Sequence, residues 1–289
     1  MSSLEILKYS FRLCAQKVVS LRAAGAYLIL VFYSSLLETP VKEFLAANGY
    51  RIAPWIFPHF LSNGSYQLVI AFCCIYFFSD TPFFTQSQMY QLNRCGRVRW
   101  MAAHILGMME SACVFALVCY FATVVVMIPH LEWNARWGAV IKTLALTDVA
   151  ELYTSPVTFS YPLITRFLPF AATGIACVLT AFLAMFLGLV MLGVGLAGNR
   201  ILAAAAATAI PMWSVIVYNM GMAARQKLSY FAPVLWLGIA DVENKIYGMW
   251  IQPPYAYIFG FLIAAILVLS GLSLVFVQKK DCVFENEDQ

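Results

Sequence analysis

Residues 168–196 read LPFAATGIACVLTAFLAMFLGLVMLGVGL and contain no charged side chain. An α-helix needs about 20 consecutive apolar residues to cross the hydrocarbon core of a bilayer, so this run is long enough to do so. Five further apolar runs follow the same pattern, each set off by polar breaks. They lie near residues 23–37, 61–79, 101–128, 201–220 and 254–277. The sequence therefore predicts an all-α integral membrane protein with six transmembrane helices.

The overall composition also favours a lipid environment. Of the 289 residues, 62% are hydrophobic and 11% are charged, whereas a soluble domain has about a quarter of its residues charged. The net charge of +4 is spread along the chain, and no basic stripe with interleaved aromatic residues occurs. We therefore expect membrane lipid as a partner, and no nucleic acid.

Lysine and arginine are distributed unevenly over the polar breaks. If the N-terminus is cytoplasmic, the breaks on that side carry 10 basic residues in 59 positions, and those on the other side carry 8 in 95. The positive-inside rule then places both termini in the cytoplasm of a multi-pass plasma membrane protein. None of the eight cysteines falls in a break assigned to the outside, which fits a reducing compartment for the exposed thiols.

The first 22 residues have the pattern of an amphipathic helix. Apolar residues recur at steps of three and four, whereas Lys8, Arg12 and Lys17 lie off this stripe. We therefore expect an interfacial helix over residues 1–22 that lies along the inner leaflet. The stripe consists of Leu4, Leu7, Phe11, Cys14, Val18 and Leu21.

The rest of the chain divides into a six-span domain over residues 23–277 and a cytoplasmic tail over 278–289. The first apolar run of this domain is short for a span. Long polar side chains at the ends of a span can reach back to the interface. We therefore expect Arg22 and Glu38 to lie at the two interfaces.

The second polar break, residues 80–100, reads DTPFFTQSQMYQLNRCGRVRW. Thr81 can cap a helix, Pro82 suits its first position, and Gly96 can end the turn that follows. This pattern predicts a helix over residues 82–94 that runs parallel to the membrane on the cytoplasmic side. Its mixed polar and apolar surface could dock a soluble partner, or the helix could simply lie on lipid headgroups.

Short motifs follow one another in a distinctive order along nearly the whole chain. They are Phe78-Ser79-Asp80, Pro82-Phe83, Tyr90, Leu92-Asn93-Arg94, Gly96-Arg97 and Trp100, then Trp137, Lys142-Thr143-Leu144-Ala145, Tyr230-Phe231-Ala232-Pro233, Trp236 and Lys279-Lys280-Asp281. In this order they resemble the motifs of ABC-2-type transporter permeases, especially a poorly characterised group from Gram-positive bacteria.

This resemblance implies the permease subunit of an ATP-binding cassette transporter. Such permeases pair, and each half docks a separate ATPase through a cytoplasmic coupling helix. The expected partners are therefore an ABC ATPase subunit and a second permease copy or a related permease. No cofactor is expected in this chain, because ATP and Mg would be bound by the ATPase. The residues expected to dock the ATPase are Phe83, Phe84, Gln88, Tyr90, Leu92 and Arg94.

Residues 231–240 are apolar but too few to cross a bilayer. We expect this stretch, with Phe231, Pro233 and Trp236, to form a short re-entrant segment before the last span, as the resemblance also implies. It would dip into the outer leaflet or pack over the exit of a pathway, because irregular backbone at that depth must be buried in protein or line a cavity. The alternative is a hydrophobic patch in an outside loop.

Three residues in or near the spans are candidates for a transport pathway: Glu110, Trp213 and Asn219. Glu110 is an acidic residue deep within the third span. A buried carboxylate costs several kcal/mol unless it is neutral or paired. Glu110 therefore either contacts the pathway or bonds, as a protonated acid, to a serine or tyrosine of a neighbouring helix.

The chain lacks a G-x-x-x-x-G-K-[ST] phosphate loop, so ATP binding by that route must come from a partner. The three histidines share no metal-ligand spacing and the cysteines form no C-x-x-C, so we predict no metal site and no catalytic residue. The expected function is export of an amphiphilic peptide, drug or lipid. The alternatives are a membrane-embedded enzyme acting on a lipid-like substrate through Glu110, and an ion-coupled carrier, which would usually show internal repeats.

Overall fold

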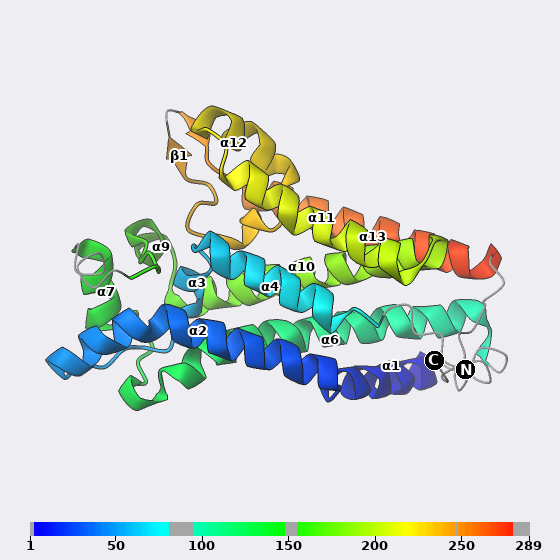
Figure 1. The fold of residues 1–289 in the computed structure, drawn as a ribbon, viewed down its shortest axis with the longest axis horizontal. Coiled ribbons are helices and arrows are strands. Elements are labelled where there is room, and N and C mark those ends of the chain that lie inside the picture. Colours follow the sequence, from blue (N-terminus) through cyan, green and yellow to red (C-terminus); the bar gives the residue numbers. More distant parts are fainter. Residues whose placement is uncertain (1–2, 81–94, 148–154, 247, 280–289) are drawn as a thin grey trace.

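The structure is a computed structural model, and it describes residues 3–80, 95–147, 155–246 and 248–279. Within these residues, the regular elements are helices apart from one hairpin of two-residue strands. Five helices are long and apolar enough to cross a membrane, which agrees with the expected all-α membrane protein. The five are α2 (Leu21–Asn48), α6 (Arg97–Val126), α10 (Pro169–Ala197), α11 (Arg200–Tyr218) and α13 (Tyr255–Lys279) (Figure 1).

The apolar run at residues 61–79 forms a shorter helix than the sequence predicts. This helix, α4 (Gly64–Phe77), has 14 residues, which corresponds to a length of about 21 Å. It starts late because the chain first turns through α3 (Phe57–Phe60), and Asn63 then caps α4 by accepting a hydrogen bond from the Tyr66 N–H at 3.1 Å. All six apolar runs are thus helical, but α4 falls well short of a hydrocarbon core of about 30 Å.

Helix α2 extends well beyond the apolar run that predicts it. It continues through Pro40 and ends where Gly49 adopts a φ of 66° and donates its N–H to Leu45 O. Glu38 is fully buried within this helix, because α2 continues past it and packs on α4 and α6. The Glu38 side chain therefore does not reach out of the protein, as the expected position at an interface would require.

The shorter elements gather at the two ends of the bundle. Figure 1 shows α7, α9, α12 and the hairpin at one end, whereas α1 and the start of α6 lie toward the other. The short elements are α1 (Ser3–Val18), η1 (Ile128–His130), α7 (Gly138–Leu146), α9 (Tyr161–Arg166), α12 (Met222–Leu228), η2 (Ser229–Phe231), η3 (Leu235–Leu237), β1 (Lys245–Ile246) and β2 (Met249–Trp250).

Helix α10 forms the centre of the bundle, since it packs against α4, α6, α11 and α13. Gly188 permits a close approach to α6, because a Cβ at this position would lie 2.9 Å from Met108 Cε. Ala184 of α10 and the small residues Ala203 and Ala207 of α11 are also buried within the chain. The small residues of both helices therefore serve packing inside this chain.

Helix α1 runs alongside the first half of α6 (Figure 1). Gly107 brings the two backbones together, because a Cβ there would lie 3.2 Å from both the Ser10 carbonyl oxygen and Leu13 Cβ. The face of α1 that carries Ser10, Cys14 and Lys17 is buried. The apolar stripe predicted for this helix is therefore split between a buried and an exposed side. Its exposed members within α1 are Leu4, Leu7 and Phe11.

His59 of α3 is fully buried at the other end of the bundle. Its ring centroid lies 5.2 Å from that of Trp137 and 5.1 Å from that of Phe159. His59 Nδ1 accepts a hydrogen bond from the Ser160 N–H at 3.3 Å. Burial lowers the pKa of His59 to about 3, so the folded protein holds the neutral ring.

Replacing Gly107 by Val should destabilise the protein by about 1–3 kcal/mol, because the new side chain overpacks the α1–α6 contact. Gly174 of α10 has open space where a Cβ would lie, so Gly174→Val is a matched control and should have little effect. Denaturant unfolding of the purified protein in detergent measures both changes. Equal losses from the two variants would contradict the tight contact.

Acidification should destabilise the wild-type protein more than the His59→Phe variant. The pKa of His59 is about 3 in the folded protein and 6.5 ordinarily, so the unfolded chain binds a proton that the folded chain excludes. The contribution of neutral His59 to the free energy of unfolding is therefore fully present above about pH 6.5. It falls by about 1.4 kcal/mol per pH unit as the pH drops from there toward about 3. Denaturant unfolding at about pH 7.5 and 5 tests this. His130→Phe, which removes a partly buried histidine and leaves His59 in place, is the matched control.

Candidate functional site

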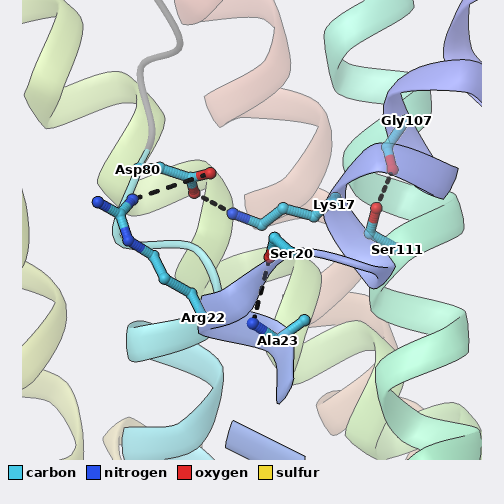
Figure 2. Close-up of polar contacts among 7 residues, drawn as sticks. All are labelled: Lys17, Ser20, Arg22, Ala23, Asp80, Gly107 and Ser111. Carbon is cyan, nitrogen blue, oxygen red and sulfur yellow. Dashed lines mark hydrogen bonds and ion pairs between the residues drawn. The ribbon is translucent and has the colours of Figure 1, made fainter. Parts of the chain in front are cut away.

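Three charged side chains meet where α1 ends and α2 begins. Ser20 caps α2 by accepting a hydrogen bond from the Ala23 N–H at 3.2 Å. Lys17 Nζ donates to Asp80 Oδ1, and Arg22 Nη1 lies 3.9 Å from Asp80 Oδ2 (Figure 2). We call these three residues the Asp80 cluster. Because Asp80 follows the end of α4, the cluster joins α4 to the junction of α1 and α2.

Lys17 is the buried member of the Asp80 cluster. Its side chain is 6% exposed, compared with 28% for Asp80 and 45% for Arg22. Lys17 Nζ lies 5.3 Å from the ring centroid of Phe77 and 5.6 Å from that of Phe78. Burial lowers the pKa of Lys17, and the Asp80 carboxylate opposes this shift. The ammonium group is thus held by one carboxylate and the faces of two rings.

A cavity of about 190 Å³ borders the Asp80 cluster, between α1 and α6. Leu13 and Gln16 line it from α1, and Ser111 lines it from α6. Ser111 Oγ donates to the Gly107 carbonyl oxygen at 2.7 Å, which satisfies this hydroxyl within its own helix (Figure 2). The Asp80 cluster therefore attaches helices to one another by charge, and the Ser111 hydroxyl beside it bonds to the backbone of its own helix.

The predicted coupling helix, residues 82–94, lies outside the described residues. Asp80 precedes this segment, and Gly96 follows it with a φ of 81° at the start of α6. Arg97 Nη1 then donates to the Gln278 carbonyl oxygen at 3.3 Å. The chain is thus attached to the bundle on both sides of the segment. The docking residues that lie outside the described part are Phe83, Phe84, Gln88, Tyr90, Leu92 and Arg94.

Glu110, the first pathway candidate, bonds to a neighbouring helix. Ser10 Oγ of α1 donates to Glu110 Oε1 of α6 at 2.9 Å. In the described part of the chain, Glu110 Oε2 has no hydrogen-bond partner. A serine on a neighbouring helix is the partner expected if Glu110 joins two helices and does not contact a pathway. A role of Glu110 in a pathway stays a prediction.

The other two pathway candidates lie on α11 and directly after it. Trp213 is partly exposed on this helix, and Asn219 is exposed at its end. Asn219 Nδ2 donates to the Val215 carbonyl oxygen at 2.9 Å. Glu110 lies on α6, which packs on α1, α2, α10 and α13, whereas Trp213 lies on α11, which packs on α4, α10 and α12, so the described contacts do not bring the candidates together.

The apolar segment 231–240 packs inside the protein. Every residue from 232 to 240 is buried, including Pro233 and Trp236, whereas Phe231 is exposed. Trp236 Nε1 donates to the Ser229 carbonyl oxygen at 2.7 Å. The segment is thus held by the bundle through short 3-10 turns, and its entry into a membrane stays a prediction.

Sequence reasoning missed the burial of Glu38 and the pairing of Lys17 with Asp80. Neither carboxylate oxygen of Glu38 has a hydrogen-bond partner among the residues that the structure describes. A signal for its burial was present, because Glu38 shares a helical face with Ser34 and Val41, which are also buried. No local signal links Lys17 to Asp80, since 63 positions separate them.

The described residues contain no group of three or more His, Cys, Asp or Glu side chains that could hold a metal ion. Comparisons with family models, curated proteins and solved structures find no match to this chain. Its function must therefore be inferred from its own sequence and geometry.

Replacing Asp80 by Ala should destabilise the protein by about 3–5 kcal/mol, because Lys17 is then buried without its carboxylate. Lys17→Met should cost less, because Asp80 is partly exposed and keeps Arg22 nearby. Arg22→Ala should cost less than about 1 kcal/mol, as expected for an exposed ion pair. Denaturant unfolding in detergent ranks the three variants.

The double variant Lys17→Met with Asp80→Ala is the internal check on this ranking. It removes both charges, so it should be more stable than Asp80→Ala alone. Purely additive losses would show that the two side chains are not coupled.

Proposed function

We propose that this chain is the permease subunit of an ATP-binding cassette transporter of the ABC-2 type, and that it exports an amphiphilic peptide, drug or lipid. A separate ATPase subunit would bind ATP and Mg and supply the energy. A second permease copy, or a related permease, would complete the transporter. The protein would lie in the plasma membrane with both termini in the cytoplasm.

The helices support the membrane setting of this proposal. Five of them have the length and composition of spans, and α4 would be the sixth. Helix α1 would meet the inner leaflet through its exposed apolar residues. Arg97 at the start of α6 contacts the end of α13, and α1 with its basic residues lies toward the same end of the bundle, as expected if this end is cytoplasmic (Figure 1).

The Asp80 cluster is the observation that carries the proposal. The segment expected to form the coupling helix starts directly after Asp80, and Asp80 is attached to Lys17 and Arg22. A force applied to this segment by an ATPase would therefore reach the junction of α1 and α2 through an ion pair. At the other end of the segment, the chain continues into α6, against which α1 packs. Both ends would thus act on the same group of helices.

The expected mechanism is conformational. Closure of two ATPase subunits on ATP would rock two permease bundles against each other and open a pathway to alternate sides. Helices α1 and α6 would move together, because the Gly107 contact and the Ser10–Glu110 hydrogen bond join them. The buried residues 232–240 would cover the outer end of the bundle.

The enzyme alternative makes a different prediction for Glu110. It requires turnover by the lone chain and loss of turnover in Glu110→Gln. The hydrogen bond from Ser10 already engages one oxygen of this carboxyl group, which favours its role in joining α1 to α6. We therefore prefer the transporter.

Purification of the chain at native expression levels should recover a nucleotide-binding ATPase in stoichiometric amount, identified by mass spectrometry. The double variant Tyr90→Ala with Arg94→Ala should lose this ATPase while the protein stays in the membrane, because both side chains belong to the proposed docking surface. Stimulation of the ATPase by the permease should be lost with it.

Tyr50→Ala with Arg51→Ala is the matched control, because it removes the same two side-chain types at exposed positions beyond the end of α2. This control should keep the ATPase. Wild-type protein that recovers no ATPase, or equal retention by the two double variants, would contradict the proposal.

A further inference from the structure

A cavity of about 450 Å³ lies beyond the end of α2, at the end of the bundle that carries α7 (Figure 1). It is lined by residues 49–51 and Ala53, which follow α2, by Glu132 and Asn134 of the chain after η1, and by the first turn of α7. Small-molecule sites have volumes of about 300–1,000 Å³, so this cavity is large enough to be one. We call it the Arg51 cavity.

Two short extended stretches place side chains of opposite charge on the face toward the Arg51 cavity. Ile52 and Leu131 form a parallel bridge. The Ile52 N–H donates to the His130 carbonyl oxygen, and the Glu132 N–H donates to the Ile52 carbonyl oxygen, both at 2.9 Å. Ile52 is fully buried and Leu131 packs against the core. Because successive side chains of an extended chain point to opposite faces, Arg51 and Glu132 point away from the core, toward the cavity that both line.

The loop between η1 and α7 is held in place by two hydrogen bonds. Trp55 Nε1 donates to the Asn134 carbonyl oxygen at 2.7 Å, and Asn134 Oδ1 accepts a hydrogen bond from the Arg136 N–H at 2.9 Å. Gly138 then starts α7 with a φ of 74°, which glycine adopts without strain, and a Cβ at this position would lie 3.5 Å from Ala53 Cβ. The walls of the Arg51 cavity are thus in place before a ligand binds, which lowers the cost of binding.

The charges that line the Arg51 cavity do not pair with each other. Arg51 and Glu132 are the two charged residues among its described lining residues, and both are exposed. Neither side chain has an ion-pair or hydrogen-bond partner in the described part of the chain. A ligand with a single charge would be attracted by one of them and repelled by the other. A zwitterion complements both charges at once.

The surroundings of the Arg51 cavity suit a ligand at a membrane surface. Tyr50 lines the cavity and is 52% exposed, and Trp133, next to Glu132 in the sequence, is 80% exposed. Tyrosine and tryptophan are enriched where lipid headgroups meet water. In the orientation proposed above, the cavity would therefore open among the headgroups of the outer leaflet.

We propose that the Arg51 cavity binds a zwitterion, with the Arg51 guanidinium holding its anionic group and the Glu132 carboxylate holding its ammonium group. The phosphoethanolamine headgroup of a lipid has this chemistry, and so does a small free zwitterion. This inference deepens the proposed function, and it rests on that function only where it identifies the ligand as cargo. The polar end of that cargo would then carry both charges.

Glycerophosphoethanolamine is the probe, because it carries both charges of the headgroup and no acyl chain. It should raise the thermal unfolding midpoint of the full chain in an uncharged maltoside detergent by about 2–4 °C at about five times its Kd. Ethanolamine lacks the phosphate and glycerol 3-phosphate lacks the ammonium group, so each should give a much smaller shift. An equal shift with either fragment, or no shift with glycerophosphoethanolamine, would overturn the proposal.

Four single variants locate the effect. Arg51→Gln and Glu132→Gln should each weaken the binding of glycerophosphoethanolamine by about tenfold, because each removes a charged hydrogen-bond partner. Arg136→Gln and Glu43→Gln are the matched controls, since both residues are exposed near the same end of α2 and neither lines the Arg51 cavity. Equal losses in the controls would contradict the site. All four positions are exposed, so the variants should fold.

Glu132→Arg tests the specificity of the site directly. It places a second cation beside Arg51, so this variant should bind glycerol 3-phosphate more tightly than glycerophosphoethanolamine. A purely structural role of Glu132 does not produce this reversal, and an unchanged preference would count against the proposal.

Lysophosphatidylethanolamine distinguishes a lipid from a free zwitterion, because it carries the same headgroup on one acyl chain. An affinity about tenfold or more above that of glycerophosphoethanolamine, together with weaker binding by Arg51→Gln, identifies a lipid headgroup. Equal affinities of the two probes identify a free zwitterion. Tight binding of the lysolipid that persists in Arg51→Gln would place the lipid elsewhere and refute the proposal.

This experiment contains no ATPase, so its outcome is independent of the test of the proposed function. The double variant Tyr50→Ala with Arg51→Ala connects the two tests, because it should keep the ATPase and lose glycerophosphoethanolamine. A chain that recovers an ATPase but binds no zwitterion would be a transporter without this site. A chain that binds the zwitterion but recovers no ATPase would keep the site and lose the transporter assignment.

Discussion

Backbone hydrogen bonding in an apolar surrounding is the constraint on which this structure depends. Hydrocarbon offers no water to N–H and C=O groups, so each crossing segment must satisfy them internally, which a helix does. Polar side chains must then find partners inside the protein. Ser34 and Tyr66 share a hydrogen bond at 3.1 Å between α2 and α4, and Thr180 Oγ1 donates to the Ala176 carbonyl oxygen at 2.8 Å within α10. Among the described residues, the Lys17–Asp80 ion pair attaches α1 to the end of α4, whereas apolar packing joins α6, α11 and α13 to α10.

Local pattern predicted the existence of the helices but not all of their ends. The six apolar runs are long and continuous, so each forms a helix whatever its neighbours do. The end of α2 depends instead on the stretch after residue 37, which contains polar residues but presents Val41 and Leu45 to the core. The start of α4 depends on the turn through α3 and the Asn63 cap. These ends are set by packing and capping, which a hydropathy pattern does not encode.

The candidate site was less accessible to sequence reasoning than the fold. Lys17 belongs to the polar side of its helix in the sequence pattern, yet Asp80 and two phenylalanine rings allow its burial. For Glu110 the sequence left two interpretations, a contact with the pathway or a bond to a neighbouring helix, and the structure shows Ser10 Oγ donating to its carboxyl group.

The shortness of α4 has a consequence for the surrounding lipid. Its 14 residues pack against α2, α10 and α11, which have 28, 29 and 19 residues. If α4 crosses the membrane, its apolar surface is shorter than the lipid tails along its exposed side, and hydrophobic mismatch makes the bilayer thin there. A change in the acyl-chain length of the lipids would then affect α4 more than the longer helices. Membrane thickness would thus act most strongly on the helix that is followed by Asp80.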